Sequence, residues 1–430
     1  MVDIISANTA AVIDQWTPDN VDRIGALLDG LPGAMAALSL PETRRAILSA
    51  AIAALDRARG SLAAVIVAEV GKTPAEAADE VDYAQSFLRH ALGQVRDAMQ
   101  DKGERRLRLE PAGPVLAITP YNDPLAGIVR KFAPSIAAGC PVVVKPSALG
   151  HLTARTLFES LANAAPTGAL AMVNHTDRSV LEKLVTDPRF RVLSFTGSTT
   201  TGLALAARAG LKRLVLELGG NNPFFVLEGA DLDSAAADAV ARKTRAAGQA
   251  CSAQNRIYVV ASLFNAFRAR FLDRLSTVTF GASDGGVAMG PVRSVRDLDR
   301  LKALTLGAQS FGAYTAPAPF AFGPVVLDDD TPLRHAEAFG PVVSLSTITD
   351  RAAAFALAAQ EEQALVCYLY GDVSHAELAP LRFGSLGINT TKIQGAEVPT
   401  GGFGTAGIGR EGGDWGLQEF QTTINERWGA

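Results

Sequence analysis

Short apolar runs separated by longer amphipathic segments fill the chain after Pro114. Val115–Ile118, Val142–Val144 and Val192–Phe195 are three such runs, and each has Gly or Pro close to both ends. A strand that is apolar at successive positions presents apolar side chains to both faces of its sheet, so both faces must be covered. The pattern therefore predicts an α/β fold in which helices cover both sides of a parallel sheet.

The length of 430 residues is too great for one hydrophobic core, so we expect at least two domains. Residues from about 20 to 100 have the apolar spacing of helices, one of which begins at Ser39–Thr43. The αβ pattern restarts after a boundary near Phe225–Val226. The elements expected there are a helix over about 231–250, a strand at Arg256–Val260, a helix over 262–275 and strands at 341–346 and 365–370.

The two ends of this pattern are flanked by segments that fit neither domain. The basic stretch Lys102–Arg108 predicts a solvated edge strand or arm. Glu419–Trp428 resembles a strand with no later element to pair with, which suggests a contact between subunits. We therefore expect one domain from 1–96 and 114–225, a second from 226–413, and an arm from 97–113 and 414–430.

Composition and charge exclude several classes of partner. There are 40 basic and 44 acidic residues, a formal net charge of −4, which provides no basic surface for nucleic acid. No uninterrupted apolar stretch has membrane-spanning length, and the start lacks the basic region of a secretory signal. Three cysteines cannot all pair in disulfides, so we expect a reducing, cytoplasmic compartment. None of them shows metal-ligand spacing with the five histidines, so we expect no metal.

One cysteine differs from the others in its surroundings. Cys140 and Cys367 adjoin or lie within apolar runs, as buried strand residues do, whereas Cys251 follows Gly248-Gln249-Ala250. A thiol in such a small-residue turn has room to face a ligand. Glu217 lies 34 residues earlier and supplies a carboxylate. Local sequence leaves two interpretations open for Glu217, a catalytic base or a strand-end carboxylate that caps the turn at Gly219.

Eight short motifs occur in a fixed order along the chain. They are Ile118–Asn122, Val144–Ser147, Phe195–Ser198, Glu217–Gly220, Gly248–Cys251, Glu337–Pro341, Ser385–Asn389 and Gly407–Glu411. From about residue 40 to 426 this order resembles the NAD(P)-dependent aldehyde dehydrogenase superfamily, nearest to its succinic-semialdehyde and lactaldehyde types. The resemblance implies an aldehyde dehydrogenase-like fold: a Rossmann-type cofactor domain, an α/β catalytic domain and a small oligomerisation arm.

The resemblance also implies a catalytic set. Cys251 is the nucleophile that attacks an aldehyde, and a thiol needs activation because its ordinary pKa is about 8.5. The Asn122 amide and the Cys251 N–H stabilise the resulting oxyanion, and Glu217 activates water to release the acid. Local sequence alone favours the alternative that Asn122 is a turn residue before Asp123-Pro124.

Cofactor contacts follow from the same resemblance. Lys145 binds the adenine ribose, Glu337 the nicotinamide ribose, and Phe339 packs on the nicotinamide. Gly197 and Ser198 open a helix whose N–H groups receive the pyrophosphate, although such helix starts are also common caps. The remaining expected contacts are Thr119, Pro120, Tyr121, Ser147 and Leu218. Many NAD-preferring relatives carry Glu where this chain has Ala148, so we expect NADP to be accepted, and NADP or NAD to serve.

Two arginines predict the substrate class. By resemblance, Arg130 and Arg245 bind the distal carboxylate of a semialdehyde, and Lys392 and Gln394 add polarity. The alternative is that both arginines lie on helix surfaces. We expect NAD(P)-dependent oxidation of a small anionic aldehyde by a homodimer or homotetramer. A CoA-acylating dehydrogenase and a catalytically silent structural or binding protein remain as alternatives.

Overall fold

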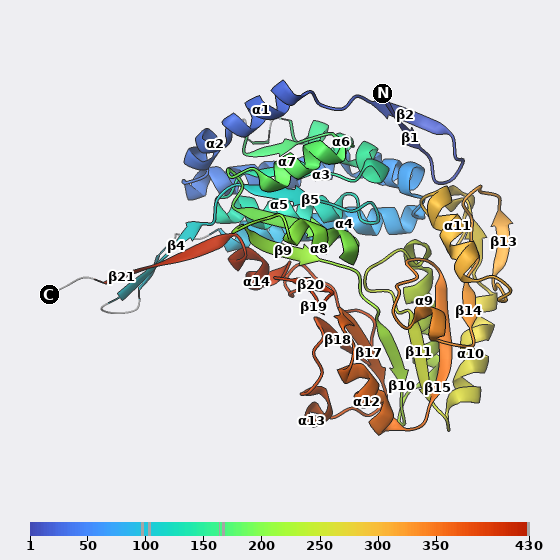
Figure 1. Cartoon of the computed structure of the whole chain (residues 1–430). Coiled ribbons are helices and arrows are strands. Elements are labelled where there is room, and N and C mark those ends of the chain that lie inside the picture. Colours follow the sequence, from blue (N-terminus) through green and yellow to red (C-terminus); the bar gives the residue numbers. More distant parts are fainter. Residues whose placement is uncertain (96–98, 102–104, 163, 166–167, 428–430) are drawn as a thin grey trace.

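The computed structural model describes residues 1–95, 99–101, 105–162, 164–165 and 168–427. Two six-stranded sheets and a three-stranded sheet organise these residues (Figure 1). The first sheet lies between layers of helices, the second forms a separate body below it in the view, and the third extends to one side as an arm. This is the expected α/β architecture.

The first sheet is parallel except at one edge. Its order is β20-β9-β8-β5-β6-β7, and β20 alone runs antiparallel, against β9. The strands are β5 Val115–Ile118, β6 Val142–Lys145, β7 Leu170–Met172, β8 Val192–Thr196, β9 Arg213–Glu217 and β20 Gly407–Ile408.

Helices cover both faces of this sheet, as the apolar runs predict. Val115 and Val142 point into a core formed by one group of helices, whereas their neighbours Leu116 and Val143 point into a second core. The first group is α3 Pro41–Val70, α4 Pro74–Gln94, α5 Ala126–Ala138 and α6 His151–Ser160. The second group is α1 Val21–Asp29, α7 Arg178–Thr186 and α8 Thr199–Ala206. The short helix α2 Leu31–Ala37 contributes to both cores.

The second sheet is parallel throughout, in the order β14-β15-β11-β10-β17-β18. Its strands are β10 Pro223–Val226, β11 Arg256–Val260, β14 Val325–Leu327, β15 Val342–Ile348, β17 Val366–Tyr370 and β18 Ser385–Ile388. Helices α9 Leu232–Thr244, α10 Phe264–Ser276 and α11 Val295–Leu304 share one core with it, and α12 Arg351–Ala359 and α13 His375–Leu378 share the other.

The arm pairs the end of the chain with an earlier segment. Its strands are β3 Met99–Asp101, β4 Arg105–Pro111 and β21 Gln421–Arg427, with α14 Gly413–Gln418 at its base. β21 lies antiparallel to β4 from Gln421 opposite Pro111 to Arg427 opposite Arg105. The strand expected at the C-terminus is therefore present; Trp428 lies outside the described residues.

Smaller elements complete the described chain. They are the strands β1 Val2–Ile5, β2 Val12–Trp16, β12 Thr279–Gly281, β13 Ala313–Ala316, β16 Gln363–Ala364 and β19 Phe403–Gly404, and the 3-10 helices η1 Ala148–Gly150, η2 Arg245–Gly248, η3 Ser283–Gly285 and η4 Thr331–Leu333. The hairpin of β1 and β2 has no counterpart in the sequence expectations.

Three expectations need correction. The boundary near Phe225–Val226 lies inside β10, which pairs with β11, so the chain changes sheets earlier, between β9 and β10. The helix expected over 231–250 ends at Thr244, because the next residues turn left-handed. β4 is the central strand of the arm and not an edge, because β21 returns from the far end of the chain to cover it. Lys102–Glu104, part of the expected basic edge, lie outside the described residues.

No single described helix is long and apolar enough to cross a membrane. The pair Val21–Ala37 and Pro41–Val70 reaches the required apolarity only together, across a bend of 115°.

Candidate active site

The loop that carries Cys251 is shaped by three successive left-handed residues after α9. Ala246 and Ala247 have φ of 50° and 52°, and Gly248 has φ of 68°. Non-glycine residues adopt this conformation only at a cost, so other contacts must hold it. The Ala246 N–H donates to Glu76 Oε1 at 2.7 Å. At Gly248 a side chain would come within 2.3 Å of the Gly340 carbonyl oxygen. The loop is therefore held by residues distant in sequence.

Cys251 itself is fixed through its backbone. The Asn222 side-chain amide donates to the carbonyl oxygens of Cys251 at 2.7 Å and Ala253 at 2.9 Å. Burial raises the pKa of the Cys251 thiol to about 12, although the Arg130 guanidinium acts in the opposite direction. The thiol is therefore neutral near pH 7 and must lose its proton when it reacts. Cys140 and Cys367 are fully buried, as expected.

Glu217 ends β9 at the carboxyl edge of the first sheet and is 5% exposed. Its Oε1 finds no hydrogen-bond partner among the described residues, and a side chain at Gly401 would come within 2.9 Å of that oxygen. Burial, reinforced by the Glu411 carboxylate, raises the pKa of Glu217 to about 8, against the opposing charges of Arg130 and Lys131. A carboxyl group with such a pKa exchanges protons near neutral pH.

A buried charge cluster lies near Glu217 and Cys251, since its Arg130 acts electrostatically on both. Lys131 Nζ bonds Glu411 Oε1 and donates to Ser194 Oγ at 3.0 Å, while Arg130 Nε lies 3.2 Å from Glu411 Oε2. Sequence reasoning assigned Arg130 to the substrate and missed Lys131 and Glu411. The motif Gly407–Glu411 was the available signal, because it ends in a carboxylate. Arg130 is 4% exposed, so most of its surface faces protein.

Asn122 follows β5 and is brought next to the Cys251 loop. It is 8% exposed and lines a small recess together with Lys72 and Gln249, two residues before the cysteine. Gln249 Nε2 donates to the Tyr121 hydroxyl at 2.8 Å. Asn122 therefore lies beside the Cys251 loop, and the Glu217 carboxylate is near enough to act electrostatically on the Cys251 thiol.

Buried polar atoms without partners in the described part of the chain lie at the carboxyl ends of the parallel strands of the first sheet. Thr119 Oγ1 after β5 and Thr196 Oγ1 at the end of β8 are buried without a hydrogen-bond partner among the described residues. The carboxyl edge of a parallel sheet is where α/β folds bind nucleotides. α8 begins there as expected, with Ser198 as its cap, accepting from the Thr201 N–H at 3.3 Å.

Two glycines near this edge of the sheet allow a close approach of neighbouring side chains. A side chain at Gly219 would come within 2.7 Å of Glu337 Oε2, and one at Gly202 within 2.3 Å of Leu218. Burial raises the pKa of Glu337 to about 8, although the Lys243 ammonium opposes the rise. Glu337 Oε1 also finds no hydrogen-bond partner among the described residues.

The residues expected at the two ends of the cofactor lie on different sheets. Phe339 precedes β15 of the second sheet, and Lys145 ends β6 of the first. Phe339 meets the Tyr121 ring edge-on at 6.1 Å, and Arg300 donates to the Phe339 carbonyl at 3.1 Å. Lys145 ends β6, where burial lowers its pKa, and Ser147 caps η1 by accepting from the Leu149 N–H at 3.2 Å.

A cavity of about 640 Å³ adjoins the cysteine loop. Arg245, Lys392 and Gln394 line it together with Tyr83, which sequence reasoning missed. Arg245 is 44% exposed in its side chain and lies 3.2 Å from Asp79, while Gln394 donates to Ser252 Oγ at 3.4 Å. Three of the four expected substrate residues thus share one cavity, and Arg130 lies buried apart from its lining.

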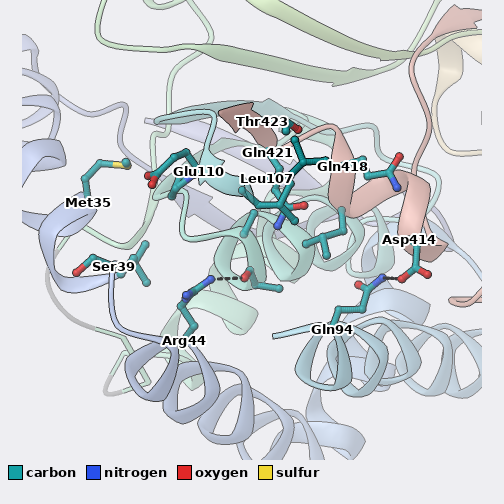
Figure 2. A pocket seen from close by; sticks show the side chains of 16 residues that line it. Met35, Ser39, Arg44, Gln94, Leu107, Glu110, Asp414, Gln418, Gln421 and Thr423 are labelled. Carbon is teal, nitrogen blue, oxygen red and sulfur yellow. Dashed lines mark hydrogen bonds between the residues drawn. The ribbon is translucent and has the colours of Figure 1, made fainter. Parts of the chain in front are cut away.

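Another cavity, of about 720 Å³, lies at the base of the arm (Figure 2). Arg44 donates from Nη1 to the Ala137 carbonyl at 3.0 Å on one side of it, and Gln94 donates to Asp414 at 3.0 Å on the other. None of the expected site residues lines this cavity.

Comparison with known proteins gives a consistent result. The model of the aldehyde dehydrogenase family matches residues 8–425. A succinate-semialdehyde dehydrogenase of Paenarthrobacter nicotinovorans is 35% identical, covering 90% of this chain and 92% of that protein. The succinate-semialdehyde dehydrogenase (NADP(+)) GabD of Escherichia coli K12 is 32% identical, covering 97% and 94%. The crystal structure of succinate-semialdehyde dehydrogenase from Burkholderia pseudomallei matches with a TM-score of 0.92 at 30% identity, covering 99% of this chain and 93% of that one.

Proposed function

The chain belongs to the aldehyde dehydrogenase family of NAD(P)-dependent oxidoreductases, and from this premise we propose that it oxidises a small anionic semialdehyde to the carboxylic acid. The observation that carries the proposal is the cavity lined by Arg245, Lys392 and Gln394 beside the loop of Cys251. Cationic side chains around a cavity that leads to a nucleophile select for an aldehyde with a distal negative charge.

The chain's own residues provide the covalent chemistry. The Cys251 sulfur adds to the aldehyde carbon, and the thiol proton passes to water because the thiol is neutral beforehand. The Asn122 amide and the Cys251 N–H hold the oxygen that becomes negative. Once the adduct has been oxidised to a thioester, Glu217 takes a proton from the water that attacks it. The acid departs, and the proton moves from Glu217 to the sulfur, which restores the Cys251 thiol.

The carboxyl edge of the first sheet offers polar groups that suit a nicotinamide dinucleotide. The buried hydroxyls of Thr119 and Thr196 lack partners among the described residues, and α8 points its N-terminus into the same edge of the sheet. Ser198 would hold the pyrophosphate, Lys145 the adenine ribose and Glu337 the nicotinamide ribose. When bound, the nicotinamide supplies the hydride acceptor.

We infer that NADP is used at least as well as NAD. Ala148 begins η1 directly after the cap residue Ser147, so this position offers no carboxylate to repel a 2′-phosphate. Lys145 lies three residues earlier and supplies a cation near this position. Burial, and not a neighbouring charge, lowers its pKa. The relative GabD of Escherichia coli carries NADP(+) in its name.

The arm supports a proposal of self-association into a homodimer or homotetramer. β21 is an outer strand with consecutive exposed residues, and Ile424 is 37% exposed on it. An outer strand that extends away from the body offers backbone groups for a partner. β4 lies between β21 and β3, whereas β21 has one free edge. We therefore assign the contact between subunits to β21.

The function is tested by mixing the protein with NADP and pairs of aldehydes of equal length, succinic semialdehyde and butanal, without CoA. Near-ultraviolet absorbance of the reduced cofactor is expected to grow, with kcat/KM higher for the anionic aldehyde. Arg245→Leu should lower kcat/KM for succinic semialdehyde by about tenfold and spare butanal, since an ion pair is lost.

Arg59→Leu serves as a matched control, because Arg59 also pairs with an aspartate but lies on the surface away from the cavity. Cys251→Ala should abolish reduction. Absorbance that grows only with CoA would support the acylating alternative, and no growth with any aldehyde would support a silent protein. An equal loss for both aldehydes in Arg245→Leu would remove the anion-binding role.

A further inference from the structure

The side-chain amide of Gln249 joins the cysteine loop to two distant segments of the chain. Its Nε2 donates to the Tyr121 hydroxyl at 2.8 Å, and its Oε1 accepts from the Arg293 backbone N–H at 3.1 Å. Gln249 is 3% exposed, so both bonds are shielded from solvent. Gln249 lies two residues before Cys251, and Tyr121 lies one residue before Asn122. One side chain therefore connects the segments of two expected catalytic residues.

The amide of Gln249 has one possible orientation between these partners. A backbone N–H only donates, so the amide oxygen must face Arg293 and the amide nitrogen must face Tyr121. The Tyr121 hydroxyl therefore accepts from Gln249, and it donates its own proton to Asp297 Oδ2 at 3.4 Å. Both ends of the amide thus have a defined partner, as a group that positions its neighbours requires.

The groups that Gln249 contacts are themselves held. Arg293 is 2% exposed, and its Nε donates to the Leu149 carbonyl at 2.7 Å. The Asp297 carboxylate beyond the tyrosine hydroxyl also accepts from Ser294 Oγ at 2.7 Å, in the first turn of α11. The Gln249 side chain is therefore part of a buried network of hydrogen bonds, and a network in which each member has partners is rigid.

The Asn122 side chain has no such support of its own. It makes no hydrogen bond within the part of the chain that the structure describes, which leaves its amide available to a ligand. Its two neighbours hold it instead. Asp123 accepts from Lys72 Nζ at 2.6 Å, which ties the segment to the end of α3, and Tyr121 accepts from Gln249. Of these two contacts, the second relates Asn122 to the cysteine loop.

We propose that Gln249 is a positioning residue that sets the Asn122 amide at hydrogen-bond distance from the oxygen of the Cys251 adduct. The inference rests on the proposed function, because it takes Asn122 and Cys251 in their catalytic roles. A donor displaced by about 1 Å from a developing negative charge costs about 10²-fold in rate. Gln249 acts through Tyr121 and does not itself react with the aldehyde.

The first test removes the amide of Gln249. Gln249→Met keeps the length of the side chain and breaks both hydrogen bonds. At saturating NADP it should lower kcat/KM for succinic semialdehyde by about 10²-fold. Alkylation of Cys251 by iodoacetamide, followed by mass spectrometry, should keep the wild-type rate, because this reaction creates no oxyanion for Asn122 to stabilise. Slower alkylation would show that the cysteine loop itself has moved and would overturn the positioning of Asn122.

A double variant isolates the link with Asn122. Asn122→Ala alone should lower kcat/KM by about 10²- to 10³-fold. Adding Gln249→Met to Asn122→Ala should cause no further loss, since no amide remains to be positioned. A further loss as large as that of Gln249→Met alone would overturn the proposal. Tyr121→Phe breaks the same bond from its other end, and it tests the proposal in the same way if Gln249→Met does not fold.

Gln94→Met is the matched control. Gln94 is also buried and also makes two hydrogen bonds, to Gly413 and Asp414 at the base of the arm. Its substitution should leave kcat/KM unchanged. Equal kcat/KM in Gln249→Met and the wild type would overturn this inference and leave the proposed function intact. Failure of the wild type to oxidise any aldehyde would overturn the proposed function and this inference together.

Discussion

At the scale of single residues, the surroundings decide what a side chain can do. Glu217 and Glu377 are chemically identical. Glu377 is exposed beside Arg351, and its pKa is lowered, chiefly by the bond with that arginine. Glu217 is buried beside Glu411, and its pKa is raised to about 8. Only the second glutamate can give up and take a proton near neutral pH.

This difference predicts how the reaction depends on pH. Glu217 acts as a base only when it is ionised, so kcat should rise with pH up to about 8 and fall about tenfold per unit below it. Glu217→Gln should leave the first turnover, seen as a burst of reduced cofactor, and slow the steady rate by about 10²- to 10⁴-fold. Stopped-flow absorbance measures both phases.

Glu377→Gln is the control for that experiment and should keep the wild-type profile. Steady turnover in Glu217→Gln equal to that of the wild type, without a burst, would exclude Glu217 as the base.

At the scale of elements, the conformation of the turn between α9 and Cys251 is not explained by the helix propensity of its own residues. The apolar pattern continues through Ala246 and Ala247, which favours helix, yet both residues are left-handed. The turn persists because Glu76 accepts from the Ala246 N–H and because Gly248 fits against Gly340. Contacts made by α4 and by the loop before β15 thus override helix propensity.

Gly248 and Gly210 have similar positive φ values, but only Gly248 is crowded by neighbouring atoms. Substituting each with Ala therefore separates the cost of the left-handed backbone from the cost of the steric clash. Gly248→Ala should lower the free energy of unfolding by about 3 kcal/mol, because the new methyl group meets the Gly340 carbonyl as well as the left-handed backbone. Gly210→Ala, at φ of 64° with nothing within 4 Å, should cost only about 1 kcal/mol. Urea denaturation measures both.

Activity should separate the same two variants. Gly248→Ala moves the loop of Cys251 and should reduce kcat, whereas Gly210→Ala should keep it. Equal losses of stability in the two variants would show that crowding at Gly340 is unimportant.

At the scale of the whole molecule, the two sheets build the site and the arm lies apart from it. Asn122 and Glu217 come from the first sheet and Cys251 from the loop before β11 of the second, so the candidate site needs both bodies. The arm joins β4 to β21 across more than three hundred residues of sequence, for example through Arg108 and Glu426 at 2.7 Å.

The arm makes a prediction about assembly. The wild-type chain should have a mass in light scattering above the 44.9 kDa of one copy. Ile424→Asp places a charge on the outer strand and should shift the mass toward the monomer. Val12→Asp, an equivalent change at a residue 52% exposed on β2, should not. A monomeric wild type, or an unchanged mass in Ile424→Asp, would contradict the role of β21.

Predictions from sequence succeeded where the cause is local. The apolar runs predicted three strands of each six-stranded sheet, namely β5, β6 and β8 in the first and β11, β15 and β17 in the second, because burial on two faces requires side chains of one kind. The start of α3 at Pro41 and the Ser198 cap of α8 followed from residues next to them. Cys251 was singled out among three cysteines by its small neighbours. The roles of all these site residues stay predictions until the experiments above are done.

The sequence by itself determined the order of strands and helices and which residue types lie near their ends. Tertiary structure alone decided that Lys72 bonds Asp123 across 51 positions and that Lys131 bonds Glu411 across 280. The charge and pKa of a buried group depend on desolvation and on neighbours from distant segments, and neither can be read from adjacent residues.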